Sequence, residues 1–343
     1  MTGTPLLELT KARMKEFLRE PEAVFWVFLF PIVLSVALGL AFREKAPDKI
    51  PVGIVDGPEA VAVAGKLAKS PALLPRIYAA QSAKEALRTG KISLLVEPGF
   101  APTYVFDPTR PDARLARLEV NDALQKGAGR ADVLASRDEK MSEPGARYID
   151  FLIPGLLAMN LMGTGMWGIG FSIVNARMRR VLKRFLATPM RKSDYLLAQA
   201  LSRLGFLVLE VTLLVGFGWI AFGVAVHGSI LLLALACLVG SASFSGIGLL
   251  VASRAQTIEA VSGLMNFVML PMWLLSGVFF SSERFPDALQ PFIRALPLTA
   301  LCDALRGVMN EARPLSGIAL PLGILAAWGV VSFFVALKIF RWK

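Results

Sequence analysis

Six segments of this chain are apolar over roughly 17–25 residues each and carry few or no charged side chains. That length is what a helix needs to cross a hydrocarbon layer about 30 Å thick. A single segment inside such a layer can satisfy its own backbone hydrogen bonds only as an α-helix. The sequence therefore predicts six transmembrane helices, over Val24–Phe42, Phe151–Val174, Leu196–Phe222, Ile230–Ala252, Ile258–Phe280 and Ile318–Ile339.

The composition agrees with a membrane protein, because 55% of the residues are hydrophobic and only 18% are charged. The first apolar segment also resembles a secretory signal peptide. We interpret it as a retained span, because it is long for a signal peptide and the Phe42-Arg-Glu-Lys45 that follows is not a small-residue cleavage site. A cleaved signal peptide is the alternative.

Basic residues gather on one side of the predicted spans, which fixes their orientation. They precede the first span, follow the last one and fill residues 177–192. On the other side, Gly223–Ser229 has no Lys or Arg, and the four bases of Ser281–Gly317 are matched by four acids. Because Lys and Arg are retained in the cytoplasm, both termini are predicted to be cytoplasmic. The net charge of +11 indicates anionic lipid headgroups and a cytosolic protein as partners, not a nucleic acid.

Residues 177–192 form the most basic segment, with seven Lys and Arg residues and no acid. Its apolar residues recur at helical spacing, at Val181, Leu182, Phe185 and Leu186. We expect a basic amphipathic helix that offers a docking surface on the cytoplasmic side. Residues 1–20 predict a second amphipathic helix, lying in the cytoplasmic interface.

Residues 43–147 lie between the first two spans and have the mixed composition of a small soluble domain. Short β-type runs alternate with helical patterns, and turns such as Asp56-Gly-Pro58 separate them. We predict strands at residues 52–56, 76–79 and 92–96, and helices at residues 58–70, 82–89 and 111–137. The sequence therefore predicts one mixed α/β domain outside the cytoplasm.

Residues 281–314, between the last two spans, are amphipathic but interrupted by three prolines, Pro286, Pro291 and Pro297. Such a segment cannot span, so we predict re-entrant or interfacial helices at the outer mouth. The candidates for an outer gate there are Phe279, Phe280, Pro297, Asp303 and Arg306. Asp303 and Arg306 are three residues apart, and we expect them to form a local ion pair.

No catalytic motif is recognisable in the chain. The Gly90-Lys91 pair lacks the other residues of a phosphate-binding loop, so no ATPase site or cofactor site is expected. With only two cysteines and one histidine in the chain, no metal site is expected either. Active transport would then need energy from another chain or from an ion gradient. Ionisable and amide residues within spans are candidates for a translocation path, namely Glu210, Asn160 and Asn266. Arg203 is expected to extend its side chain to the cytoplasmic interface, although Glu210 lies on roughly the same face.

Three stretches resemble a known family, the membrane subunits of type 2 ABC exporters. The first is the basic segment that ends in Leu182-Lys-Arg-Phe-Leu-Ala-Thr-Pro189, similar to the family's loop between its second and third spans. The second runs from Leu275-Ser-Gly-Val-Phe-Phe280 through Phe285-Pro286 to Leu296-Pro-Leu-Thr-Ala300. The third is the domain that begins with Val52-Gly-Ile-Val-Asp56, similar to the subfamily with a large domain after the first span.

The resemblance implies that the basic segment is a coupling helix, which docks on a separate ABC ATPase subunit. The docking residues it assigns are Arg177, Arg179, Arg180, Lys183, Arg184, Leu186 and Pro189. It also implies a working unit of two membrane subunits and two ATPases, with ATP and Mg²⁺ bound to the ATPases. Where the family commonly has Gly-Thr-Leu-Glu, this chain has Arg180-Val-Leu-Lys183, so the partner's contact surface should be more acidic than usual.

Taken together, the sequence predicts the permease of an exporter with a lipophilic substrate such as a drug, lipid or peptide. An ion-coupled secondary transporter is one alternative, for which only Glu210 qualifies as a mid-membrane carboxylate. A signalling protein with an outer sensor domain is the other, but it would normally carry a cytosolic output domain. The outer domain is also a possible binding site for a periplasmic partner.

Overall fold

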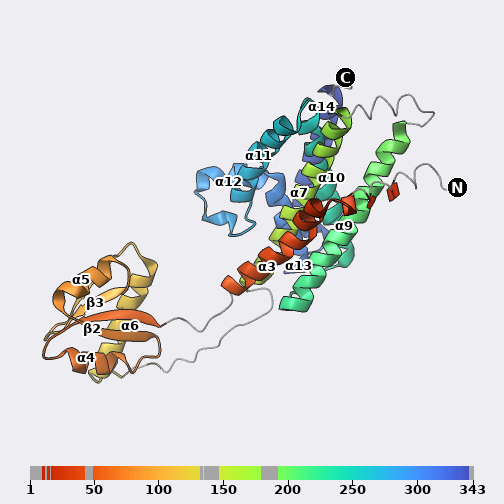
Figure 1. Ribbon diagram of the computed structural model, residues 1–343. Coiled ribbons are helices and arrows are strands. Elements are labelled where there is room, and N and C mark those ends of the chain that lie inside the picture. The colour runs from red at the N-terminus through yellow and green to blue at the C-terminus, as the bar shows by residue number, and fades with distance from the viewer. Residues whose placement is uncertain are drawn as a thin grey trace. The chain divides into compact units, whose positions relative to one another are not determined.

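The computed structural model describes residues 10–11, 14–15, 17–42, 49–131, 134, 147–178 and 192–339, with the backbone alone for 192–201. The chain divides into two compact units (Figure 1). One unit combines Met1–Arg43 with Met141–Lys343, and the other is Glu44–Lys140.

Six helices in the described residues are long and apolar enough to cross a membrane. The first is bent, with α2 (Pro21–Val24), a π-helical turn η1 (Phe25–Leu29) and α3 (Phe30–Ala41) in one continuous run. The others are α7 (Tyr148–Met178), α9 (Lys192–Phe222), α10 (Ile230–Ala252), α11 (Ile258–Leu275) and α14 (Leu315–Ile339). All six predicted spans are thus helical, and α10 has the predicted bounds.

The fifth helix ends earlier than predicted, at Leu275 instead of Phe280. The chain leaves the helix at Ser276, and Gly277 adopts a positive φ of 76°. That conformation suits glycine, which has no Cβ to clash, and it commonly ends a helix. The apolar run Val278-Phe-Phe280 is therefore loop, although its composition continues that of the span.

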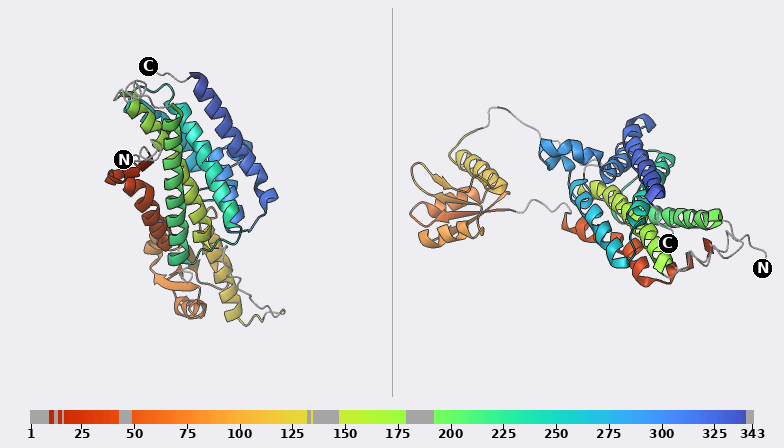
Figure 2. Two further views of the ribbon diagram at one scale, coloured as in Figure 1. Left: turned by 90° about the vertical axis from the view of Figure 1, so that its right-hand side faces the viewer. Right: turned by 90° about the horizontal axis from the view of Figure 1, so that it is seen from above.

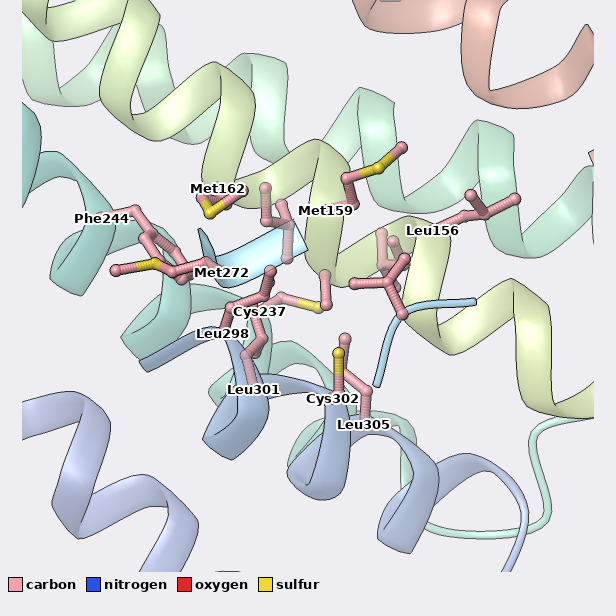
Figure 3. Close-up of a cluster of buried hydrophobic side chains, with 14 of the residues drawn as sticks. Leu156, Met159, Met162, Cys237, Phe244, Met272, Leu298, Leu301, Cys302 and Leu305 are labelled. Atoms are coloured by element: carbon pink, nitrogen blue, oxygen red, sulfur yellow. The ribbon is translucent and has the colours of Figure 1, made fainter. Parts of the chain in front are cut away.

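α7 is the central helix of this unit (Figure 2), and 83% of its most apolar stretch is buried. It packs against α3, α9, α10, α11 and the short helix α13 (Pro297–Met309). Glycines let the neighbours approach closely: a Cβ on Gly248 of α10 would lie 2.7 Å from the carbonyl oxygen of Met166. Figure 3 shows the shared core, formed by Leu156, Met159, Met162, Cys237, Phe244, Met272, Leu298, Leu301, Cys302 and Leu305.

The segment before α14 is broken into short helices, as the prolines predict. They are η2 (Ser282–Arg284), η3 (Asp287–Leu289), α12 (Gln290–Ala295) and α13. Pro286 precedes η3, and Pro291 and Pro297 stand in the first turns of α12 and α13, where a missing N–H costs little. α13 is not a surface helix, because most of its residues are buried against α7, α10 and α14.

The second unit is a four-stranded sheet in the order β2-β1-β3-β4. Its parallel strands are β1 (Ile50–Val55), β2 (Leu73–Tyr78) and β3 (Leu94–Glu97), and β4 (Thr103–Val105) is antiparallel to β3. The helices α4 (Ala60–Leu67) and α6 (Pro111–Gly127) share one hydrophobic core with the sheet, and α5 (Ala80–Arg88) forms another. This unit is mixed α/β, as predicted, but β4 was not expected, and α6 ends at Gly127 and not near residue 137.

Candidate functional site

A buried cluster of Arg203, Glu210 and Thr164 lies near the middle of α7 and α9. Arg203 Nη1 is 2.9 Å from Glu210 Oε1, and the Glu210 residue is only 2% exposed. Thr164 completes the cluster, because Arg203 Nη2 donates to its hydroxyl at 2.7 Å and the hydroxyl donates to Glu210 Oε2 at 3.1 Å. The expectation that Arg203 extends to the cytoplasmic interface is therefore wrong.

The reason lies in the reach of the two side chains. Seven residues are about two helical turns, or roughly 10 Å along α9, which both long side chains together can bridge. Leaving a carboxylate unpaired in this apolar interior would cost several kcal/mol, whereas the pair is electrically neutral. The two charged side chains in the middle of α9 are thus satisfied by each other and by Thr164 within the fold.

The other two candidates for a translocation path differ in burial. Asn160 is 8% exposed and donates from Nδ2 to the carbonyl oxygen of Val27, at 3.1 Å, which joins α7 to the π-helical turn of the first span. Asn266 is exposed on α11. The three candidates do not form one site. Asn160 belongs to α7, Glu210 meets α7 through Thr164, and Asn266 is an exposed residue of α11.

A second cluster surrounds Arg306 of α13. Its guanidinium donates to the carbonyl oxygens of Phe151, at 3.2 Å, and Gly277, at 2.5 Å, and it lies 3.5 Å from the centre of the Phe151 ring. The predicted ion pair with Asp303 is wrong, because Asp303 is exposed and the Arg306 side chain turns inward. α13 is buried among three other helices, so the Arg306 side chain reaches backbone carbonyls that need a donor.

The remaining outer-gate candidates lie around the same cluster. The carbonyl oxygen of Phe279 accepts a hydrogen bond from the Tyr148 hydroxyl at 2.9 Å. Phe280 is exposed and its ring contacts that of Phe285, with 5.9 Å between centroids. Pro297 is buried at the start of α13.

Three polar residues that the sequence reasoning missed meet at this end of α7. Arg147 is paired with Asp150 at 2.8 Å and donates to the carbonyl oxygen of Phe222, at the end of α9. Asn310 donates from Nδ2 to the carbonyl oxygen of Asp150, at 2.9 Å. The signal that marks Asp150 is its position, because it is a charged residue directly at the start of a span.

A third cluster lies at the opposite end of α7, around Arg177. Its guanidinium donates to the carbonyl oxygens of Ala252, at 3.3 Å, and Ser253, at 3.2 Å, and also to that of Ala255. The last carbonyls of a helix lack intrahelical donors and carry partial negative charge, so a guanidinium there is stabilising. Arg177 therefore caps the end of α10 and joins it to α7. The other predicted docking residues lie outside the described residues, namely Arg179, Arg180, Lys183, Arg184, Leu186 and Pro189.

The helical unit is that of a polytopic membrane protein, with charged side chains that are held by partners within the fold. Residues 22–338 match the model of the ABC-2 family transporter proteins. Because the match covers nearly the whole sequence, the chain belongs to this family, and the resemblance seen in the basic segment and in the Leu-Pro-Leu-Thr segment is confirmed.

Named relatives point the same way. The chain is similar to Nodulation protein J of Bradyrhizobium diazoefficiens, with 29% identity over 199 residues, which cover 57% of this chain and 75% of that protein. It is also similar to the inner membrane transport permease YadH of Escherichia coli, with 26% identity over 47% of this chain and 63% of YadH. The probable multidrug ABC transporter permease YbhR of Escherichia coli is 27% identical over 47% of this chain and 44% of YbhR. The matched region is thus less than two thirds of either Escherichia coli protein. The chain is a membrane permease subunit of an ABC transporter.

Proposed function

We propose that this permease is part of an ATP-driven exporter, which moves a lipophilic substrate by alternating access. In this proposal a separate ABC ATPase docks on residues 177–192, and two permease copies with two ATPases form the working unit. The observation that carries it is the Arg177 cap, because it ties the start of the docking segment to the ends of two further helices.

The cap suggests how ATPase movement reaches the membrane. Arg177 is the next-to-last residue of α7, and its three carbonyl partners belong to the end of α10 and to the turn before α11. A force on the docking segment that follows α7 would therefore move the end of α7, the end of α10 and the start of α11 together. Rigid-body movement of packed helices is a common way for transporters to alternate between states. In this proposal Arg177 positions the docking segment from within the permease.

The orientation belongs to the same proposal. Basic residues before the first span, in the 177–192 segment and after α14 favour a cytoplasmic location for these parts. The α/β unit, which follows the first span, then lies outside the cytoplasm, where a periplasmic partner could reach it. The Arg177 cluster is on the cytoplasmic side and the Arg306 cluster on the outer side.

The side chains around the core favour a lipophilic substrate over a highly charged one. The central cluster is apolar, and the buried carboxylates of Glu210 and Asp150 are each paired with an arginine. A highly charged substrate would need polar groups along its path that are free to bind it. One relative, YbhR, is named as a probable multidrug permease, and a drug is among the substrates proposed here.

The same pairing argues against an ion-coupled secondary transporter. Such a protein needs a carboxylate in the membrane that can bind and release the coupling ion. Glu210 is held by Arg203 and Thr164, with 2% of its surface exposed, so it is already neutralised. A sensor protein has no need for a docking segment tied to three helix ends.

Co-purification with the ATPase tests the proposal. The double variant Lys183→Glu/Arg184→Glu should lose the ATPase, while Lys338→Glu, a charge reversal near the end of α14, should retain it. Both permeases should keep the apparent Tm of the unaltered protein. Proteoliposomes with the complete complex should accumulate a lipophilic fluorescent compound only with ATP. ATPase binding that survives the double charge reversal, or uptake driven by an ion gradient without ATP, would refute the proposal.

A further inference from the structure

Two prolines stand inside the membrane helices that meet at the centre of the fold. Pro31 is the second residue after the π-helical turn of the first span, and Pro154 lies in the first part of α7. Proline has no N–H, so the carbonyl four residues earlier loses its helical hydrogen bond. The carbonyl affected in α7 is that of Asp150. In the first span Pro31 follows a π-helical turn, whose bonds run five residues back, so its missing N–H leaves a gap in the bonding of the turn that contains Val27. In hydrocarbon an unsatisfied carbonyl is costly, because no water is available to replace the donor.

The carbonyls of Val27 and Asp150 each receive a hydrogen bond from an asparagine of a neighbouring helix. Asn160 Nδ2 lies 3.1 Å from the oxygen of Val27, and Asn310 Nδ2 lies 2.9 Å from the oxygen of Asp150. Asn160 belongs to α7 and Asn310 directly follows α13. A side-chain amide thus replaces the missing backbone donor at both bends.

The bend at Pro154 has additional contacts from the same direction. Arg306 donates to the carbonyl oxygen of Phe151, the next residue after Asp150. Gly155 allows the backbone of the loop after α11 to approach, since a Cβ there would lie 2.5 Å from the Val278 oxygen. α13 and this loop therefore contact α7 on both sides of Pro154.

The arrangement is selective. Pro271 and Pro321 interrupt α11 and α14 in the same way, and would free the carbonyls of Phe267 and Gly317. Among the described residues, no side-chain donor reaches either of these carbonyls. Pro31 and Pro154 thus differ from Pro271 and Pro321 in having an asparagine that reaches a carbonyl one turn before the proline.

We propose that Asn160 and Asn310 are positioning residues that hold these two proline bends, and that transport requires the bends. In this inference, which rests on the proposed function, the start of α7 moves with α13, and the bend of the first span moves with the middle of α7. The asparagines keep each bend satisfied while the bodies move.

A double-mutant cycle tests the pairing without any ATPase or substrate. Asn310→Ala should lower the apparent Tm of the purified permease by about 2–5 °C, the effect of losing one buried hydrogen bond in a protein of this size. Pro154→Ala restores the backbone donor, so in that background Asn310→Ala should lower the apparent Tm by about 1 °C or less. Pro321→Ala is the matched control, because in that background Asn310→Ala should lower the apparent Tm as much as it does in the unaltered protein. If Asn310→Ala does not yield folded protein, Asn160→Ala with Pro31→Ala provides the same cycle. Additive effects in the cycle would overturn the inference.

Transport by the complete complex tests whether transport requires the bends. The Pro154→Ala/Asn310→Ala variant should bind the ATPase and remain stable, but lose transport, because α7 then has an unbroken hydrogen-bond ladder at residue 154. Full transport by this stable variant would overturn the role of the bend. The stability cycle reports on the permease alone, so its result does not depend on whether ATP drives export.

Discussion

Arg203 and Glu210 lie seven residues apart on α9, yet their side chains meet at 2.9 Å inside the protein. The Glu210 side chain is 1% exposed and the Arg203 side chain 15%, so both charges are removed from solvent. Breaking a buried pair is far more costly than replacing both partners, because a single deletion leaves one charge without compensation. Comparing single and double variants of the pair therefore shows whether its role is structural or lies in transport.

We expect Glu210→Leu to destabilise the permease by about 3 kcal/mol or more, because Arg203 is left uncompensated. The double variant Arg203→Met/Glu210→Leu should be close to the unaltered protein in stability, since both charges are gone. Apparent Tm values in one detergent measure both effects. If the double variant is stable and transports normally, the pair is structural. A stable double variant without transport would assign the pair to the substrate path.

Arg177 offers a test of the coupling between helix ends. Arg177→Met should remove the cap on α10 and cost up to about 2 kcal/mol, the range for a cation at a partly buried helix end. ATPase binding should remain, because the side chain faces the permease's own carbonyls. Transport per ATP hydrolysed should fall. Loss of ATPase binding in this variant alone would instead make Arg177 a direct docking residue.

The spans and their number could be predicted from the sequence, because hydrophobic length is a local property. The ion pair of Arg203 and Glu210 could not, since the helix periodicity gives the face of each residue but not the rotamers of long side chains. Arg306 shows the same limit: the spacing to Asp303 favours a local pair, and the burial of α13 decides against it. The coupling role of residues 179–191 stays a prediction, because those residues are outside the described ones.

Arg306 can be tested through its planar guanidinium. Arg306→Lys keeps the charge but loses the fork that reaches two carbonyls at once, so we expect a lower apparent Tm and weaker transport. Asp303→Asn is the matched control, because Asp303 is exposed and not paired with Arg306, and should change neither property. Equal effects of the two variants would restore the ion pair that the sequence predicts.

The α/β unit has its own sheet and two hydrophobic cores, so we expect residues 49–131 to fold when expressed alone. Its acidic residues then predict how stability depends on pH. The hydrogen bond from Arg110 lowers the pKa of Asp112, and Ser93 adds a second one. The hydrogen bond from Lys126 lowers the pKa of Asp122.

A carboxyl whose pKa is lower in the folded state than in the unfolded chain stabilises the fold above the unfolded pKa, about 3.9 for Asp. This contribution is lost as the pH falls through the folded pKa. The urea midpoint of the isolated unit should therefore be steady from pH 7 to about 5 and decline below about pH 4. Asp112→Asn should lower the midpoint at pH 7 and flatten the decline. A midpoint that rises on acidification would contradict the assigned hydrogen bonds.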